Sequence, residues 1–201
     1  MKKIYLVVLC ALISAGTYAQ GIGFGVKAGA NVANVKISDG QYSLDTKPKI
    51  GFHGGVFVTI MITDALGVQP ELLLSTQGAK YDVDYFDGKL ILNYVAIPLL
   101  VRYNINDMFS IHAGPQFGIL VKADEEYDGD TYSVKDDFKS MDIAGAIGLE
   151  VNLPANLGVG ARYLFGLSSA LTSDNSFGDA KLKNGVIQVY VIYRIKRIDN
   201  N

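Results

Sequence analysis

Eight stretches of this chain alternate apolar residues with polar or small ones at every second position. In the first stretch, Phe24 and Val26 fall on one face, whereas Lys27 and Asn31 fall on the other. Strict alternation over about ten residues is typical of a β-strand with one apolar and one polar face. The pattern therefore predicts an all-β chain. The eight stretches are residues 22–32, 50–61, 66–77, 93–103, 109–119, 142–151, 158–167 and 187–195.

The connections between these stretches are alternately short and long. Short turns are predicted at Thr63-Asp64, Asn106-Asp107 and Pro154-Ala155-Asn156. Long polar connections are predicted at residues 34–48, 81–89, 122–138 and 168–183. Barrels of the outer membrane have short periplasmic turns and longer extracellular loops. The sequence thus predicts an eight-stranded antiparallel up-and-down transmembrane β-barrel.

The residues expected to face inward carry charges of both signs. In hydrocarbon an unpaired backbone group costs several kcal/mol, so a sheet that crosses a membrane must close on itself. An eight-stranded barrel encloses a lumen that side chains can fill. Because buried charges need partners, we expect ion pairs that plug the lumen and leave no open pore. The inward charges are Lys27, Glu71, Arg102, Asp142, Glu150, Arg162 and Arg194.

Residues 1–19 have the organisation of a cleaved signal peptide. Lys2 and Lys3 precede an apolar run from Ile4 to Ile13, and small residues lead to Ala19. The run is too short for a transmembrane helix, which needs about 20 apolar residues. The only cysteine, Cys10, lies inside this run. The mature domain, residues 20–201, is therefore expected to carry no thiol, disulfide or lipid anchor.

The charge balance argues against nucleic acid as a partner. The formal net charge of the whole chain is -2, and loss of Lys2 and Lys3 would make the mature chain more acidic, whereas nucleic-acid-binding domains are basic. A membrane-spanning helix needs about 18 consecutive apolar residues, and no stretch of the mature chain has so many. We therefore expect the mature chain to pass the inner membrane and to reach the outer membrane. Outer-membrane lipid and the barrel assembly machinery are its expected partners there.

Outward-facing residues distinguish a membrane barrel from a soluble one. A soluble barrel would have to hide sets such as Val95, Ile97, Leu99 and Val101, whereas a membrane barrel exposes them to lipid. Aromatic residues near the strand ends suit the interfacial girdles of such barrels, although they are also good strand formers. These aromatic residues are Tyr103, Phe109, Tyr163 and Tyr193.

Four motifs occur in order along the chain: Q-P-E-L-L-L-S-T-Q-G at 69–78, N-Y-V-A-I-P-L-L-V-R-Y at 93–103, H-A-G-P-Q-F-G at 112–118 and A-R-Y-L-F-G-L at 161–167. With these motifs the chain resembles the outer-membrane β-barrel domain proteins of the Bacteroidetes, a family that includes the type IX secretion accessory barrel. The resemblance implies an outer-membrane barrel without a common catalytic residue, cofactor or ligand. It also implies architectural roles for Glu71, Tyr94, Pro98, Arg162 and Tyr163.

Two histidines are the strongest candidates for chemistry. His53 and His112 fall on inward faces, and Ser110, Glu71 and Asp142 could lie near them. A serine, a histidine and a carboxylate together would form the triad of a lipid hydrolase. No nucleophile motif accompanies these residues. We therefore interpret them as hydrogen-bonding groups of the lumen and predict no catalytic residue.

Acidic residues gather in the long connections, where they suggest a calcium site. The stretch D-E-E-Y-D-G-D places oxygen ligands at alternating positions, as calcium sites do. It lacks the helix-flanked spacing and the terminal glutamate of an EF-hand, so we predict solvated loops without metal. No glycine stands between a strand and a helix, so no cofactor site is expected. The acidic residues are Asp82, Asp84, Asp87, Asp124, Glu125, Glu126, Asp128, Asp130, Asp136 and Asp137.

Three classes of function are compatible with these residues. The first is a non-enzymatic outer-membrane barrel whose long loops contact a partner in a structural, adhesive or secretion-accessory role. The second is a soluble periplasmic barrel that binds a small molecule, and the third is a lipid-modifying enzyme of the outer membrane. The outward apolar faces favour the first.

Overall fold

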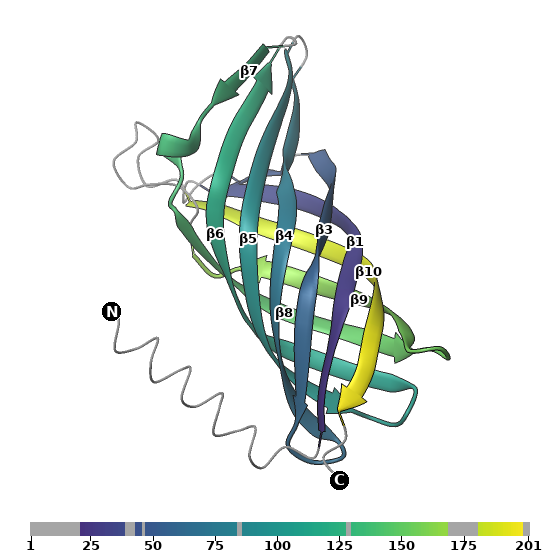
Figure 1. The fold of residues 1–201 in the computed structure, drawn as a ribbon. Coiled ribbons are helices and arrows are strands. Elements are labelled where there is room, and N and C mark those ends of the chain that lie inside the picture. Colours follow the sequence, from purple (N-terminus) through teal and green to yellow (C-terminus); the bar gives the residue numbers. More distant parts are fainter. Residues whose placement is uncertain are drawn as a thin grey trace.

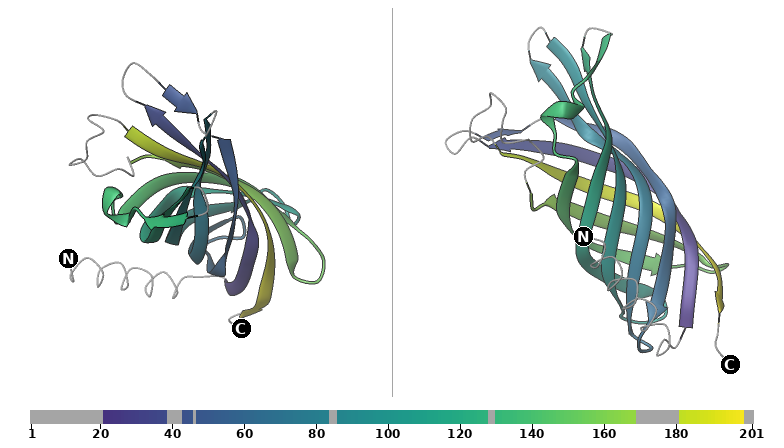
Figure 2. Two further views of the ribbon diagram at one scale, coloured as in Figure 1. Left: turned by 90° about the horizontal axis from the view of Figure 1, so that it is seen from above. Right: turned by 60° about the vertical axis from the view of Figure 1, so that its left-hand side comes forward.

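The strands predicted from the alternation form a closed ring (Figures 1 and 2). The computed structural model describes residues 21–38, 43–45, 47–83, 86–127, 130–168 and 181–198, so the expected signal peptide lies outside the described residues. Each strand of the ring pairs antiparallel with its neighbours, and the last strand pairs with the first along residues 22–38, which confirms the predicted fold. The ring consists of β1 (Gly21–Ser38), β3 (Lys47–Met61), β4 (Leu66–Val83), β5 (Phe86–Asn104), β6 (Phe109–Tyr127), β8 (Met141–Asn152), β9 (Leu157–Gly166) and β10 (Lys181–Ile198).

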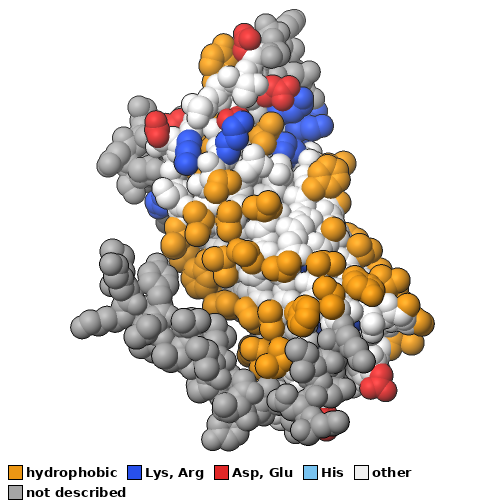
Figure 3. All heavy atoms as spheres, in the orientation of Figure 1, with side chains coloured by type: hydrophobic (Ala, Val, Ile, Leu, Met, Phe, Trp, Pro, Cys, Tyr) orange, Lys and Arg blue, Asp and Glu red, His pale blue; other side chains and the backbone are white. Residues whose placement is uncertain are grey.

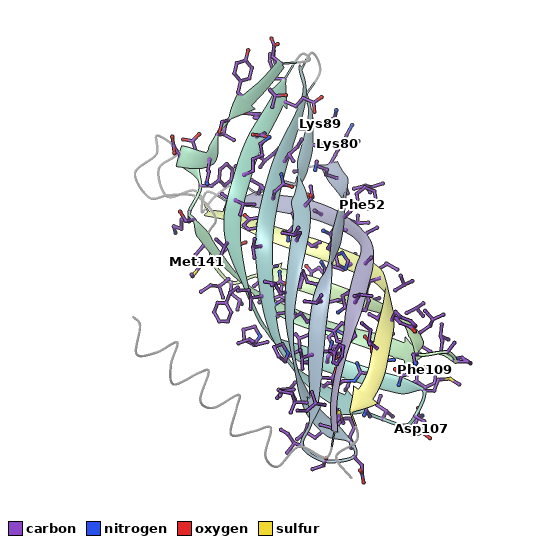
Figure 4. The ribbon with its side chains drawn as sticks, in the orientation of Figure 1. Phe52, Lys80, Lys89, Asp107, Phe109 and Met141 are labelled. Atoms are coloured by element: carbon purple, nitrogen blue, oxygen red, sulfur yellow. The ribbon has the colours of Figure 1, made fainter. Side chains whose placement is uncertain are left out.

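Apolar side chains point outward along the ring, as the alternation predicts. Phe52 and Leu74 are 70% and 67% exposed, whereas their inward neighbours His53 and Ser75 are buried. The outward side chains form an apolar band around the visible face of the barrel (Figure 3). Phe52 and Met141 lie near the upper margin of this band, and Phe109 lies near its lower margin (Figure 4). An apolar surface of this extent is stable in lipid and not in water, so the alternative of a soluble barrel is wrong.

The three short turns lie where the sequence places them. Leu66 N donates to Thr63 Oγ1 over 2.9 Å in the β3–β4 turn, and Phe109 N donates to Asn106 Oδ1 over 2.7 Å in the β5–β6 turn. In the β8–β9 turn, Ala155 and Asn156 have φ of 59° and 63°. Two successive left-handed residues are what a two-residue type I′ hairpin turn requires. No helix in the described part of the chain is long and apolar enough to cross a membrane.

Strand structure continues far into the segments that we expected to be long loops. β4 and β5 pair up to Val83 and Phe86, and β6 turns back into β7 (Asp130–Ser133). A further short strand, β2 (Ser43–Asp45), pairs with the end of β1. Residues 81–89 and 122–138 are therefore long polar connections, but much of their length consists of paired strands that extend beyond the predicted strand ends. The polar outer faces of these extensions concealed their strand structure in the sequence.

A small apolar core stabilises these extensions. The chain after β7 forms a 3-10 turn, η1 (Lys135–Asp137), and returns along β6, where Leu120 N donates to Ser140 O over 3.0 Å. The Phe138 side chain joins a cluster of buried side chains from β4, β5 and β6. We call residues 76–83, 86–93, 122–127 and 130–133 the extracellular sheet, because they form the end of the barrel opposite the short turns (Figure 1), and long connections of such barrels lie outside the cell. The core consists of Ala79, Leu90, Leu92, Tyr94, Leu120, Ala123 and Phe138.

The short-turn end carries outward aromatic side chains. Tyr103, Phe109 and Tyr193 are 48%, 44% and 46% exposed there, in positions that suit an interfacial girdle. Tyr163 lies further from the short turns, where its ring stacks on Phe165 at 6.2 Å. By the usual orientation of such barrels the short turns face the periplasm. Below the band lies Asp107, and above it lie Lys80 and Lys89 (Figure 4).

A charge placed in the apolar band should destabilise the protein far more than the same charge on the extracellular sheet. Ile147, 57% exposed, lies midway along β8 in the band, and Tyr132, 56% exposed, lies on β7 outside it. We expect Ile147→Arg to reduce the free energy of unfolding in lipid vesicles by about 2–4 kcal/mol, because arginine is costly at the bilayer midplane. The control Tyr132→Arg should change it by at most about 0.5 kcal/mol. Equal effects in urea titrations of the two variants would contradict the placement of the membrane.

Candidate functional site

The lumen holds a buried ionic cluster centred on Glu71. Lys27 Nζ lies 2.6 Å from Glu71 Oε1, and Arg162 binds both oxygens of that carboxylate, with Nη2 at 2.8 Å from Oε1 and Nη1 at 3.0 Å from Oε2. The side chains of all three residues are fully buried. Because they come from β1, β4 and β9, the cluster joins distant walls of the barrel. A bidentate arginine pair fixes orientation as well as distance.

A second ionic cluster surrounds Glu150 nearer the short turns. Arg102 Nη1 and Arg194 Nη2 each lie 2.5 Å from the same oxygen, Glu150 Oε1. Gln69 connects this cluster with the first, since it accepts from Arg102 Nη1 at 3.3 Å and donates to Glu71 Oε1 at 2.8 Å. The predicted ion pairs of the lumen are thus confirmed for these charges. The polar contacts form one continuous network from Lys27 to Arg194.

Asp142 is the exception among the inward charges. Its carboxylate accepts hydrogen bonds from Ser168 Oγ at 2.7 Å and from Asn184 Nδ2 at 3.0 Å. No ion pair of Asp142 occurs within the described ranges. Neutral donors therefore compensate this charge, at a level of the lumen closer to the extracellular sheet.

Neither histidine forms a hydrogen bond with Ser110, the serine of the possible triad. His53 Nδ1 donates to Asn31 Oδ1 over 2.7 Å, whereas His112 Nε2 accepts from Arg162 Nε at 3.2 Å. Ser110 Oγ instead accepts from Arg102 Nη2 at 2.6 Å. Among the described residues, no serine is hydrogen-bonded to a histidine. The geometry therefore lacks the connected serine, histidine and carboxylate that triad chemistry requires.

The acidic residues of the long connections are dispersed where the structure describes them. Asp124 pairs with Lys122, and Glu126 pairs with Lys89 at 3.1 Å. No group of three or more histidine, cysteine, aspartate or glutamate side chains suited to a metal ion occurs among the described side chains. Asp84 and Asp128 lie outside the described residues, as do the side chains of Asp82 and Asp87.

Small residues make room for the large side chains of the lumen. A Cβ atom on Gly160 would lie 2.5 Å from the Tyr190 ring, and one on Gly148 would lie 2.6 Å from His112 Nε2. The inward glycines therefore make room for neighbouring side chains. Two members of the network were missed: Asn104 accepts from Arg102 and Asn152 accepts from Arg194. Continuing the alternation one step beyond Arg102 and Glu150 would have found both.

Comparisons with known proteins agree with this geometry. Residues 18–172 match the model of a family described as outer membrane protein beta-barrel domain. No curated protein sequence matches the chain.

Solved structures of small outer-membrane barrels are similar to this one. Ail, the attachment invasion locus protein of Yersinia pestis, is 20% identical, with a TM-score of 0.53, over 88% of this chain and 99% of its own. Neisserial surface protein A is 16% identical, with a TM-score of 0.49, over 85% of this chain and 96% of its own. At these identities the similarity to Ail concerns the fold. Together with the family match and the apolar band, it shows that the chain belongs to the outer membrane protein β-barrel domain family and resides in the outer membrane.

Proposed function

We propose that this barrel is a non-enzymatic, non-conducting contact protein that displays an open-edged sheet at the cell surface. The observation that carries the proposal is the free edge of β7. Among the described strands, β7 pairs only with β6, and all four of its residues are exposed. An unpaired strand edge offers backbone donors and acceptors to an extended peptide. The proposed partner is therefore an extended segment of another protein.

The direction of the free donors follows from the hydrogen bonding beside β7. Val134 N donates to Ala123 O over 3.0 Å, so this amide points toward β6. Amide directions alternate along a strand, so the N–H of Tyr132 also points toward β6. The N–H groups of Thr131 and Ser133 then point away from β6, toward the open edge.

Contacts on both faces of the extracellular sheet keep the edge of β7 in position. Phe138 and the core around it fill its inner face. On its outer face, Thr76 Oγ1 donates to Asn93 Oδ1 over 2.7 Å, and Lys89 pairs with Glu126. A preorganised edge loses less conformational entropy on binding than a mobile loop does. The resemblance to Bacteroidetes barrels extends the proposal to two settings, adhesion to another surface and contact with a secretion apparatus of the same envelope.

The side chains that fill the lumen support a structural role for it. Side chains from distant strands meet across it at Glu71, and a second, apolar cluster that includes Phe138 is buried on the side of the extracellular sheet. An eight-stranded barrel is narrow enough for such side chains to fill it, which supports a non-conducting role. The histidines are engaged with Asn31 and Arg162, which supports a non-enzymatic one.

Proline substitutions on β7 should test the contact role. We expect the pair Thr131→Pro and Ser133→Pro to weaken binding to immobilised, reduced and alkylated α-lactalbumin, a source of extended chain, at least tenfold. These substitutions remove donors at the open edge without breaking the β6–β7 pairing. The measurement is surface plasmon resonance with the barrel in nanodiscs.

The matched control is the pair Thr131→Ala and Ser133→Ala, which keeps both backbone amides and should bind like the wild type. Absence of wild-type binding, or equal binding by the proline variant, would reject strand addition at β7.

Removal of one buried charge should show that the lumen network is structural. Glu71→Gln leaves Lys27 and Arg162 without their carboxylate, and loss of one partner of a buried pair typically costs about 3–5 kcal/mol. We expect a loss of this size in the free energy of unfolding, measured by urea titration in detergent micelles. The control Glu126→Gln disrupts a surface pair and should cost at most about 1 kcal/mol. A similar loss in both variants would mean that the buried cluster contributes little.

The filled lumen should give no steady ion conductance. We expect the purified barrel in a planar lipid bilayer to produce no discrete current steps under conditions in which a porin control does. Uniform steps from the wild-type protein would show that the lumen opens and would overturn the non-conducting role.

A further inference from the structure

The periplasmic end of the lumen contains a cavity of about 520 Å³. It lies among the start of β1, the ends of β3 and β10, and the β8–β9 turn. Its polar lining consists of Thr59, Arg102, Asn104, Asn152, Asn156 and Arg194. Typical binding sites for small molecules have volumes of about 300–1,000 Å³, and the volume of this cavity lies in that range.

Positive charge is in excess around this cavity. Arg102 and Arg194 share one carboxylate, that of Glu150. The neighbouring cluster also has one more cation than carboxylate, since Lys27 and Arg162 share Glu71. Uncompensated charge in a low-dielectric interior is costly, so the arrangement favours an anion that enters from the open end.

The two arginines at the cavity differ in their free donors. Arg102 donates from all three nitrogens, to Asn104, Gln69, Glu150, Ser110 and Asn152. Arg194 donates only from Nη2 to described side chains, at 2.5 Å to Glu150 and 2.7 Å to Asn152. The Arg194 side chain is also 28% exposed, against 5% for Arg102. Its Nε and Nη1 donors are therefore the ones available in the cavity.

The cavity wall holds Arg194 in position. The Arg194 amide donates to Asn156 O over 2.9 Å, which fixes β10 to the β8–β9 turn. Asn152, which accepts from Arg194, itself donates to Asp107 O over 2.8 Å in another turn. A guanidinium anchored on one side with donors free on the other is suited to bind carboxylate or phosphate oxygens.

We propose that the periplasmic cavity is a binding site for a small organic or inorganic oxyanion, with Arg194 as its principal ligand. Arg102 contributes charge and fixes Glu150, and the amide of Asn156 lies at the rim. The site is at the opposite end of the barrel from β7, so it is independent of the proposed contact role.

The test uses the mature barrel in a nonionic maltoside detergent at constant low chloride concentration. The probes are inorganic phosphate and succinate, and the readout is the NMR shift of the Arg194 Nε–Hε signal and of the amides in the β8–β9 turn. We expect at least one probe to give saturable shifts confined to the cavity. Saturation by phosphate alone identifies a phosphate site, and saturation by succinate identifies a carboxylate site. Each probe is titrated to 100 mM, about one hundred times a dissociation constant of 1 mM. If neither probe gives a saturable shift in this range, the proposal is overturned.

Two variants locate the site. Arg194→Gln should weaken binding at least tenfold, followed through the turn amides. Asn156→Asp preserves side-chain size and leaves the Arg194 ion pair intact, yet adds a negative charge at the rim, so it should also weaken binding. The control Lys135→Gln removes an exposed cation at the extracellular end and should leave affinity unchanged. Heat-dependent gel migration confirms that each variant is folded, and unchanged affinity in both cavity variants would overturn the assignment.

Discussion

The structure depends on the pairing of β1 with β10. A sheet in hydrocarbon has no water to satisfy an open edge, so every ring strand needs two neighbours. The register from Ile22–Ile198 to Ser38–Lys181 supplies the last of these pairings. Once the ring is closed, alternate side chains must point either to lipid or to the lumen. This division determines where the charges, amides and apolar residues of the chain lie.

The lumen is a polar core, in contrast to the apolar interior of a soluble protein. Its residues are held by directional contacts, above all the two pairs that Arg162 makes with Glu71 and the link that Gln69 provides to Arg102. Such a network is stable only if its members remain paired, because each buried charge would otherwise stay uncompensated. An apolar cluster that includes Leu100, Leu164 and Val186 is buried beside it. The result is a rigid support for the extracellular sheet.

Local pattern was sufficient to predict most of the barrel. Strand positions, the direction of side chains such as Leu74 and His53, and the three short turns all follow from alternation and turn chemistry, because these depend on neighbours in sequence. The partners of the inward charges could not be predicted. Arg162 meets Glu71 across 91 positions, and that meeting depends on strand tilt and register around the whole ring.

The strands of the extracellular sheet could not be predicted for a different reason. Beyond the membrane the outer face of a strand is exposed to water and can be polar, so a stretch with residues such as Lys80 and Lys89 has the composition of a loop. Their buried apolar side chains pack in one cluster with Phe138, which lies on a later segment of the chain. The candidate site was also predicted only in part. Arg102, Glu150 and Arg194 were identified as inward charges, but the cavity beside them forms where the β8–β9 turn meets the ends of strands that are distant in the sequence.

Closure by β1 and β10 also has a consequence for biogenesis. These strands are the most distant in the chain, so their contact is the least local in the protein and should form late. Until it forms, both strands expose unpaired backbone groups next to apolar side chains such as Val26 and Val191. These are the features that promote aggregation between chains. The period between export and insertion is therefore the stage at which this protein most needs protection.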